Sequence, residues 1–344
     1  MFIIISLLVL GFLIVVHELG HFVVAKVVGI QVDEFSIGFG PKLLSIKSQR
    51  DQTRYSFRLL PLGGYVKMAG MEPNDDHING FNKKPLKDRF AVISAGSLTN
   101  FLVAIVLFII VFSLIGIPTP SNANIIGDII SGSPADRAGL KTGDRIIKVN
   151  DVNTPRWNDI ANKIHKSGGQ KVRLVIERSG HTYTFYVTPQ FDPQMQISQI
   201  GIRQGIRWER QGFLQAVRLG LDRAFGFSKL ILVGILGMVT GAVPPSEIAG
   251  PVGITQMIGD AARGGLGYLL SFTAILGINL ALVNLLPIPA LDGSRLMFLC
   301  IEGIRGKPID PEKENFIHLI GFALLMVLFL LITYNDLVRI LAGG

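Results

Sequence analysis

The chain has 344 residues, of which 49% are hydrophobic and only 17% are charged, and this composition is typical of a membrane protein. The formal net charge of +8 would suit a nucleic-acid partner, but the basic residues are scattered over loops and one polar insert. We therefore attribute the excess to membrane topology and anionic lipid, and expect no nucleic-acid partner. Cys300 is the only cysteine, which excludes an internal disulfide.

The first predicted element is an apolar segment from about Phe2 to Val28. It carries no charge before residue 17 and is long enough to span a bilayer as a helix. A secretory signal would have a basic start and a small-residue cleavage site, and this segment has neither. We expect it to be retained as the first membrane span.

This span contains a metal-binding pattern, His17-Glu18-Leu19-Gly20-His21. Residues four apart lie on one face of a helix, so His17 and His21 can offer two imidazoles to one cation. Glu18 stands where a carboxylate can take a proton from a metal-bound water instead of ligating the metal. Such short patterns also arise by chance, but ionisable groups at membrane depth are costly and are functional by default.

The connection from Gly29 to Phe90 is rich in Lys and Arg, so the positive-inside rule makes it cytoplasmic. The N-terminus then faces outward, and the metal site lies toward the cytoplasm. Residues 55–68 in this connection have strand-like side chains interrupted by Pro61 and the Gly63-Gly64 pair. They predict at least a hairpin beside the membrane.

A second span is predicted from Ala91 to Ile117, with Asn100 as its main polar residue. Asn100 can hydrogen-bond to a neighbouring helix or line a cavity. After this span the composition becomes polar, with short β-type segments from about residue 121 to 189. At about 70 residues this insert is large enough for one small domain.

The region from Arg203 to Lys229 is predicted to be an amphipathic helix at the membrane interface. The apolar segment from Ile231 to Val243 is short for a span, and we expect it to be half-buried rather than a crossing.

A third span is predicted from Gly265 to Leu286, followed by Pro287, Pro289 and Asp292. The two prolines forbid a regular helix there, and such irregular backbone is tolerated at membrane depth where it is buried in protein or lines a wet cavity. Asp292 is the best candidate for a third metal ligand, and the alternative is a helix cap outside the membrane. Basic residues after it predict a cytoplasmic connection, on the same side as His17. The last span is predicted from Phe316 to Tyr334, with His318 as an interfacial residue rather than a ligand.

Together these segments resemble one family, the bacterial site-2 proteases, which are zinc metalloproteases of regulated intramembrane proteolysis, in the subgroup with an extracytoplasmic PDZ domain. The resemblance covers nearly the whole chain and rests on five segments, in this order: His17-Glu-Leu-Gly-His21, Leu62-Gly-Gly-Tyr-Val-Lys-Met68, Ala95-Gly-Ser-Leu-Thr-Asn100, Gly250-Pro-Val-Gly253 and Leu291-Asp-Gly293. Residues 133–150 are similar to the core signature of a circularly permuted PDZ domain. Two departures are visible, because Ser97 and Ser294 replace a proline and a glycine usual in these motifs.

The resemblance implies a polytopic α-helical membrane protein with about four transmembrane helices, a membrane-associated β-loop and an inserted PDZ domain. The implied domains are a first half of the protease core at 1–117, the PDZ domain at 121–190, an amphipathic segment at 203–245 and a second half of the core at 250–344. It places the protein in the bacterial cytoplasmic (inner) membrane as a multi-pass protein, with the PDZ domain and both termini outside.

The resemblance also implies a reaction, the hydrolysis of a peptide bond within a transmembrane segment. Zn²⁺ would be held by His17, His21 and Asp292, with Glu18 as the general base. A substrate-binding role follows for Asn284, whose alternative role is helix-to-helix hydrogen bonding. The same role is expected for Gly63, Gly64 and Tyr65 in the β-loop, because a strand edge can hold an unwound segment.

Substrates would be single-span membrane proteins that have already been trimmed, such as an anti-sigma factor or remnant signal peptides. The PDZ domain would bind a peptide terminus along a strand edge near Ile125-Ile126-Gly127, or act only as a steric plug. Two rival classes are a non-catalytic membrane scaffold, in which Glu18 is dispensable, and an ion transporter, which predicts an inverted repeat that the sequence does not show.

Overall fold

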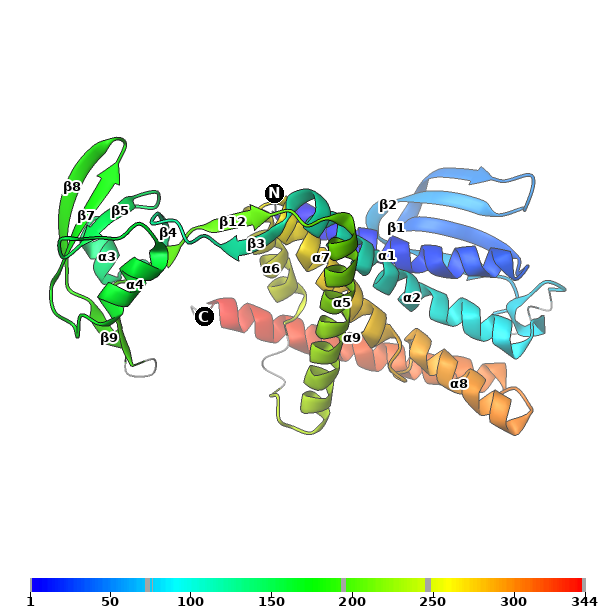
Figure 1. Cartoon of the computed structure of the whole chain (residues 1–344). Helices are drawn as coiled ribbons and strands as arrows, with labels where there is room; N and C mark the ends of the chain where they lie inside the picture. Colours follow the sequence, from blue (N-terminus) through cyan, green and yellow to red (C-terminus); the bar gives the residue numbers. More distant parts are fainter. Residues whose placement is uncertain (1, 72–74, 76, 193–195, 245–248, 342–344) are drawn as a thin grey trace. The chain divides into compact units, whose positions relative to one another are not determined.

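The structure is a computed structural model that describes residues 2–71, 75, 77–192, 196–244 and 249–341. The chain forms two compact units (Figure 1). The first, here called the membrane unit, comprises Met1–Leu114 and Gly212–Gly344, and the second, the inserted unit, comprises Ile115–Gln211. The ends of the predicted domains at residues 1, 245 and 344 fall outside the described residues.

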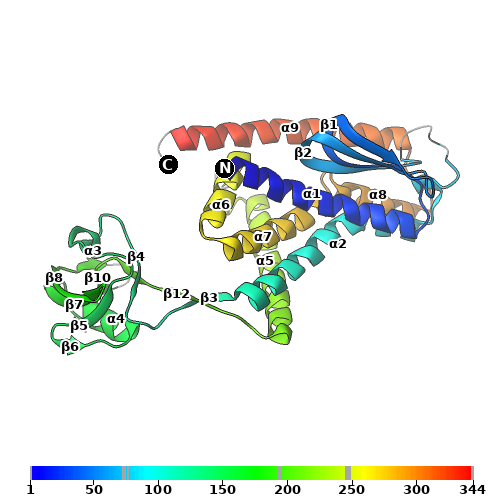
Figure 2. The ribbon, with the colours of Figure 1, turned by 90° about the horizontal axis from the view of Figure 1, so that it is seen from above.

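The membrane unit consists of helices and one long hairpin. In chain order its elements are α1 (Phe2–Val27), β1 (Val32–Lys47), β2 (Arg54–Met68), η1 (Phe81–Lys83), α2 (Leu86–Ile110), η2 (Val111–Ile115), α5 (Phe213–Val239), α6 (Pro251–Arg263), α7 (Leu266–Asn284), α8 (Asp292–Arg305) and α9 (Pro311–Leu341). Figure 2 shows α1, α2 and α7 side by side, and the antiparallel β1–β2 hairpin beside the C-terminal half of α1.

Four helices among the described residues are long and apolar enough to cross a membrane, at Phe2–Val27, Leu86–Ile115, Leu266–Asn284 and Glu312–Val338. They confirm a polytopic α-helical membrane protein. The second of them begins at Leu86 rather than at the predicted Ala91. Arg89, close to this start, can be buried because it forms a bidentate ion pair with Glu302 of α8.

Helices α1 and α2 pack closely at a pair of small residues. A Cβ atom on Gly20 of α1 would lie 2.5 Å from the carbonyl oxygen of Ala95 and 2.5 Å from Oγ1 of Thr99, both on α2. A glycine at position 20 therefore lets the two backbones approach, as small residues do between membrane helices. This contact fixes the level at which α2 passes the histidines of α1.

Helix α5 differs from its prediction. Residues 202–204 and 206–209 are strands of the inserted unit, and Phe213–Val239 is one continuous helix instead of an amphipathic helix followed by a separate half-buried segment. Its buried face consists of small residues spaced four apart, namely Ala216, Gly220, Ala224 and Ser228. This face packs on α2 and α7, and Figure 1 shows α5 running steeply across the direction of α1 and α9. The sequence pattern missed it because small residues do not register as an apolar stripe.

The Gly250-Pro-Val-Gly253 segment is explained by a contact with α9. Asp336 of α9 is only 2% exposed, and its carboxylate accepts hydrogen bonds from the backbone N–H groups of Gly250 (3.3 Å) and Gly253 (2.8 Å). Both N–H groups belong to the first turn of α6, where backbone N–H groups have no acceptor within the helix. A Cβ atom on Gly250 would lie 2.6 Å from the Asp336 carboxylate, so glycine is needed there.

We predict that Asp336→Leu lowers the free energy of unfolding by about 1–3 kcal/mol, because it leaves buried N–H groups without an acceptor. Asp336→Asn keeps one carbonyl oxygen and should lose less. Thermal unfolding of the purified protein in detergent measures both, with the exposed Asp260→Asn on α6 as the control. Equal unfolding of Asp336→Leu and Asp260→Asn would contradict this assignment.

The inserted unit is built around a four-stranded antiparallel sheet in the order β6-β5-β7-β8. Its elements are β3 (Ile117–Pro120), β4 (Ile126–Ile129), α3 (Pro134–Arg137), β5 (Arg145–Val149), β6 (Val152–Asn153), α4 (Trp157–His165), β7 (Val172–Arg178), β8 (His181–Val187), β9 (Gln190–Asp192), β10 (Ile197–Gln199), β11 (Ile202–Gln204) and β12 (Ile206–Glu209). The first and last strands, β3 and β12, pair with each other, so the unit is longer at both ends than the predicted 121–190.

The strand edge expected to bind a peptide is already occupied. On one side of β4, Ile126 donates its N–H to the carbonyl of Asp144 and accepts from the N–H of Gly143, both at 2.8 Å. On the other side, β4 pairs with β11, and Ile126 lies opposite Gln204. The predicted peptide site at residues 125–127 is therefore wrong, because the segment is internal to the fold rather than at an edge.

Candidate metal centre

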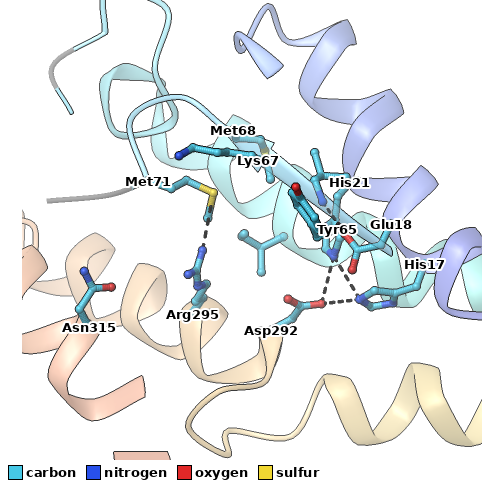
Figure 3. A pocket seen from close by; sticks show the side chains of 12 residues that line it. His17, Glu18, His21, Tyr65, Lys67, Met68, Met71, Asp292, Arg295 and Asn315 are labelled. Carbon is cyan, nitrogen blue, oxygen red and sulfur yellow. Dashed lines mark hydrogen bonds and ion pairs between the residues drawn. The ribbon is translucent and has the colours of Figure 1, made fainter. Parts of the chain in front are cut away.

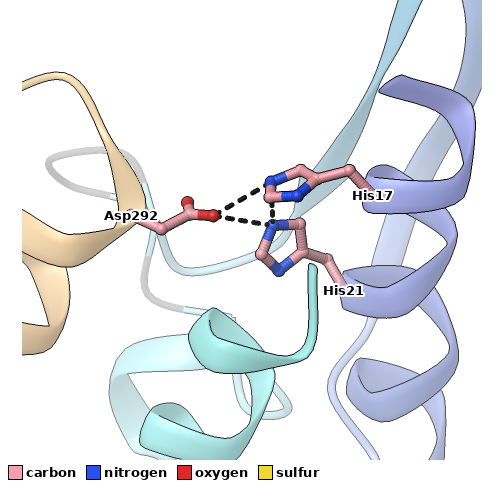
Figure 4. Close-up of side chains that lie close together, drawn as sticks. All are labelled: His17, His21 and Asp292. Atoms are coloured by element: carbon pink, nitrogen blue, oxygen red, sulfur yellow. Dashed lines mark hydrogen bonds and ion pairs between the residues drawn. The ribbon is translucent and has the colours of Figure 1, made fainter. Parts of the chain in front are cut away.

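His17 and His21 lie one turn apart on α1 and face the same point (Figure 4). Their Nε2 atoms are 3.1 Å apart, and both residues are buried, with exposed fractions of 7% and 6%. The Nδ1 atom of His21 is 2.8 Å from the carbonyl oxygen of Val92 on α2. Because a carbonyl can only accept, Nδ1 carries the proton and Nε2 presents its lone pair, as in a histidine that ligates a metal.

Asp292 reaches the same point from the other half of the membrane unit. Helix α7 ends at Asn284, residues 285–291 are not helical, and Asp292 is the first residue of α8. A Cβ atom on Gly293 would lie 2.1 Å from the carbonyl oxygen of Leu286, so only glycine lets the chain fold back over this loop. The Asp292 carboxylate then points at the histidines and not at the backbone of its own helix.

The three side chains are arranged as metal ligands are. Oδ2 of Asp292 lies 3.0 Å from Nε2 of His17 and 3.2 Å from Nε2 of His21. A tetrahedral zinc ion with bonds of about 2.0–2.2 Å separates its ligand atoms by about 3.3–3.5 Å, so small movements would suffice. Two imidazoles and one carboxylate are also the donor types of hydrolytic zinc sites. The residues present therefore fit zinc.

The charge on Asp292 suits this role. Burial favours its protonated form, but the two imidazoles of His17 and His21 that face the carboxylate hold the pKa of the carboxyl below its usual range. Asp292 is thus an anion at neutral pH, ready to bind a cation.

Glu18 lies beside the three side chains without joining them. Its Oε2 atom accepts a hydrogen bond from the backbone N–H of Val66 on β2, at 3.1 Å. The carboxylate forms part of the wall of a cavity of about 470 Å³ (Figure 3). The cavity is lined by His17, Glu18, His21, Tyr65, Val66, Lys67, Met68, Met71, Ile93, Asp292, Arg295 and Asn315.

Of the three β-loop residues predicted to bind substrate, only Tyr65 lines this cavity. Its hydroxyl accepts a hydrogen bond of 2.6 Å from Arg58, which keeps the ring in place. Gly63 has a φ of +124°, and a Cβ atom on Gly64 would lie 2.5 Å from the carbonyl oxygen of Ser36 on β1. The two glycines therefore let β2 pack on β1 and α1, and they bring Tyr65 and Val66 to the site.

The amide of Asn284 lies next to His17, one of the three candidate ligands. Its Nδ2 atom is 3.4 Å from Nε2 of His17, at the last turn of α7. Asn100, in contrast, is fully buried and its side chain makes no hydrogen bond within the described part of the chain. Neither of the two contacts expected for Asn100 is therefore present.

The sequence analysis missed Gly96 of α2. A Cβ atom at this position would lie 2.4 Å from Nε2 of His21 and 2.7 Å from Cε1 of His17. Gly96 therefore leaves the space that the two imidazoles occupy. The signal was present as the small residues Ala95-Gly96-Ser97 in an otherwise bulky span, but nothing in the sequence says which helix face they lie on.

Comparison with known proteins gives a consistent result over nearly the full length. The sequence profile of peptidase family M50 matches residues 5–328. A Clostridium acetobutylicum protein described as a candidate zinc metalloprotease is 38% identical and covers 98% of this chain and 97% of its own. The zinc metalloprotease RasP of Geobacillus kaustophilus is 35% identical, with 96% of both chains covered. The regulator of sigma-W protease RasP of Bacillus subtilis is 32% identical, with 97% of both covered.

Among solved structures, the PDZ domain of an SdrC-like protein from Listeria monocytogenes matches 26% of this chain and 93% of that domain, at 17% identity and a TM-score of 0.22. A likeness at this score carries no argument about the fold, so the assignment of the inserted unit as a PDZ domain stays a prediction.

Proposed function

This chain belongs to peptidase family M50, and from that membership and the geometry of the site we propose that it is a zinc-dependent endopeptidase that cuts within the membrane. The observation that carries the proposal is the meeting of His17, His21 and Asp292, with Glu18 beside them, in a polar cavity. All four residues lie in or next to helices that are apolar enough to span a bilayer. Ionisable groups are expensive there and are kept for function.

The ion would be held by Nε2 of His17, Nε2 of His21 and the carboxylate of Asp292. When bound, zinc supplies Lewis acidity, which polarises a peptide carbonyl and makes a water molecule a better nucleophile at neutral pH. Glu18 accepts the proton of the attacking water and returns it to the leaving amine nitrogen. The N–H of Val66 orients the Glu18 carboxylate through one oxygen and leaves the other free for this transfer.

Two further groups position the substrate. Asn284 points its amide at the ligand cluster, where an N–H can donate to the carbonyl oxygen as negative charge develops on it. The edge of β2 that carries Val66 faces the site and can hold an unwound segment by strand addition, with the Tyr65 ring as a wall. Such support is needed because a peptide bond in a membrane helix is shielded by the helix's own hydrogen bonds.

The substrates we propose are single-span membrane proteins that have already lost their bulky outer part. The family membership and the name of the Bacillus subtilis relative, a regulator of sigma-W protease, support an anti-sigma factor as one class, and remnant signal peptides are another. The inserted unit, as a PDZ domain, would bind a peptide terminus or exclude untrimmed proteins.

We place the protein in the bacterial cytoplasmic membrane with the metal site toward the cytoplasm and with the inserted unit and both termini outside. The support is the set of Lys and Arg residues in the β1–β2 hairpin and in the connection that contains α8, which the positive-inside rule assigns to the cytoplasm. The bilayer is thus the permanent partner of the four spans and of α5, whose basic residues Arg218, Arg223 and Lys229 suit anionic headgroups.

The test is zinc-dependent cleavage in liposomes. We predict that the zinc-loaded protein cuts a tagged, pre-trimmed single-span substrate inside its span, and that mass spectrometry of the products locates the bond there. A chelator should abolish the cut, and added zinc should restore it. Cleavage that persists after verified metal removal, or a cut only outside the span, would reject the proposal. A non-catalytic scaffold predicts binding without any cut.

A further inference from the structure

The loop that presents Asp292 is held from outside by a histidine of the last helix. The backbone N–H of Ala290 donates a hydrogen bond to Nδ1 of His318 on α9, at 3.0 Å. Ala290 is two residues before the metal ligand. Because Nδ1 accepts this bond, the neutral ring carries its proton on Nε2. The His318 side chain is only 14% exposed, so this bond is shielded from water.

The loop needs such support because its backbone is strained. Ala290 has a φ of +76°, a left-handed conformation that a residue with a Cβ atom adopts at a cost. The loop's own bonds, from Ile288 N to Leu286 O and from Leu291 N to Ile288 O, leave the N–H of Ala290 without a partner inside the loop. His318 supplies the acceptor for that group, and thereby favours the conformation that aims Asp292 at the histidines.

Packing against α8 and against the loop places His318 and its helix beside Ala290. Its ring packs edge-to-face on Phe298 of α8, with the centroids 5.9 Å apart and the planes at 90°. Its Nε2 atom lies 3.7 Å from the carboxylate of Glu314, one turn earlier on α9. One turn later, a Cβ atom on Gly321 would lie 2.1 Å from Pro289, so the backbone of α9 touches the same loop. Because the imidazole has a defined position, its Nδ1 atom also defines the position of the Ala290 N–H in the loop.

We propose that His318 is a positioning residue for the third metal ligand: its Nδ1 acceptor holds the Ala290–Asp292 turn in the geometry that lets Asp292 complete the zinc site. This inference rests on the proposed zinc function and extends it to a residue of α9 that touches neither metal nor substrate. Groups that hold a ligand in place commonly change metal affinity by about 10- to 100-fold.

The experiment compares two substitutions that separate acceptor from packing. His318→Phe keeps a ring against Phe298 and removes the acceptor, whereas His318→Asn loses the ring and keeps a short side-chain oxygen that can accept the N–H. Zinc affinity is measured by competition with a chelator, and the visible spectrum of the cobalt-substituted protein reports the ligand geometry. His77→Ala is the matched control, because Nδ1 of His77 also accepts a backbone N–H, from Asn79 at 3.1 Å, in an exposed turn.

We expect His318→Phe to weaken zinc binding by about 10- to 100-fold and to shift the cobalt spectrum, with His318→Asn close to the wild type and His77→Ala unchanged. Unaltered affinity and spectrum in His318→Phe would overturn the inference, as would a loss in His318→Asn alone, which indicates packing. If the wild type itself binds no zinc, the proposed function fails instead. The two failures are thus distinguishable, and none of these readouts depends on catalysis.

Discussion

Replacing Glu18 by Gln is expected to lower the rate of intramembrane cleavage by roughly 10²- to 10⁴-fold while leaving zinc bound. The amide has nearly the same shape, and its oxygen can still accept the hydrogen bond from the N–H of Val66. It cannot take a proton from the attacking water, so only the proton transfer is removed. The measurement is cleavage of the tagged substrate in liposomes, with the zinc content of the same preparation determined by mass spectrometry.

The control is Glu209→Gln, which makes the same chemical change on an exposed strand of the inserted unit and should leave the rate unchanged. Glu18→Asp is informative as well, because it keeps a carboxylate but withdraws it by one methylene. If Glu18→Gln and Glu209→Gln cleave at the same rate, Glu18 is not the base, and the scaffold hypothesis gains.

Replacing Gly96 by Ala is expected to remove zinc and activity together, with little effect on the fold. The new methyl group would collide with the imidazoles of His17 and His21, which are side chains that can swing away. Their displacement separates the ligand atoms from Asp292. We expect zinc affinity to fall by about 100-fold or more, since displaced ligands should cost at least as much as lost supporting contacts. Chelator competition and thermal unfolding of the metal-free protein measure the two effects.

Gly226→Ala is the matched control, because Gly226 lies in helix α5 and a Cβ atom there meets nothing within 4 Å. It should bind zinc normally and be neutral or slightly stabilised, since alanine has the better helix propensity. Normal zinc affinity in Gly96→Ala would contradict this prediction, because it would show that the two imidazoles can accommodate the methyl group without leaving the site. A large loss of stability in the metal-free protein would show instead that the collision is relieved by the backbone.

The four spans were predictable because each is a long, uninterrupted apolar segment, and the bilayer thickness sets its length. The start of α2 could not be predicted, because the burial of Arg89 depends on an ion pair with Glu302, more than 200 residues away in the chain. Helix α5 was missed for a related reason. Its buried stripe consists of alanine, glycine and serine. These small residues allow the backbone of another helix to approach closely, and a hydropathy pattern does not detect this effect.

The two histidines could be placed together from their spacing alone, since a helix fixes what lies four residues apart. Asp292 could be proposed only from a broken apolar segment and a family resemblance, because no local rule links residues on α1 and α8. The roles of Gly96 and His318 could not be predicted from helical spacing or from the family resemblance. One acts by lacking a side chain and the other through a backbone N–H of a loop, so neither has a residue type that signals metal chemistry.

The division of the membrane unit into two chain segments has a consequence for biosynthesis. His17, Glu18 and His21 leave the ribosome early, but Asp292 follows only after the whole inserted unit and α7 have been made, roughly tens of seconds later at usual rates. During that interval a nascent chain carries the two proposed histidine ligands and the proposed base, but not the proposed third ligand. The proposed zinc site therefore cannot be complete until the second chain segment of the membrane unit has been synthesised.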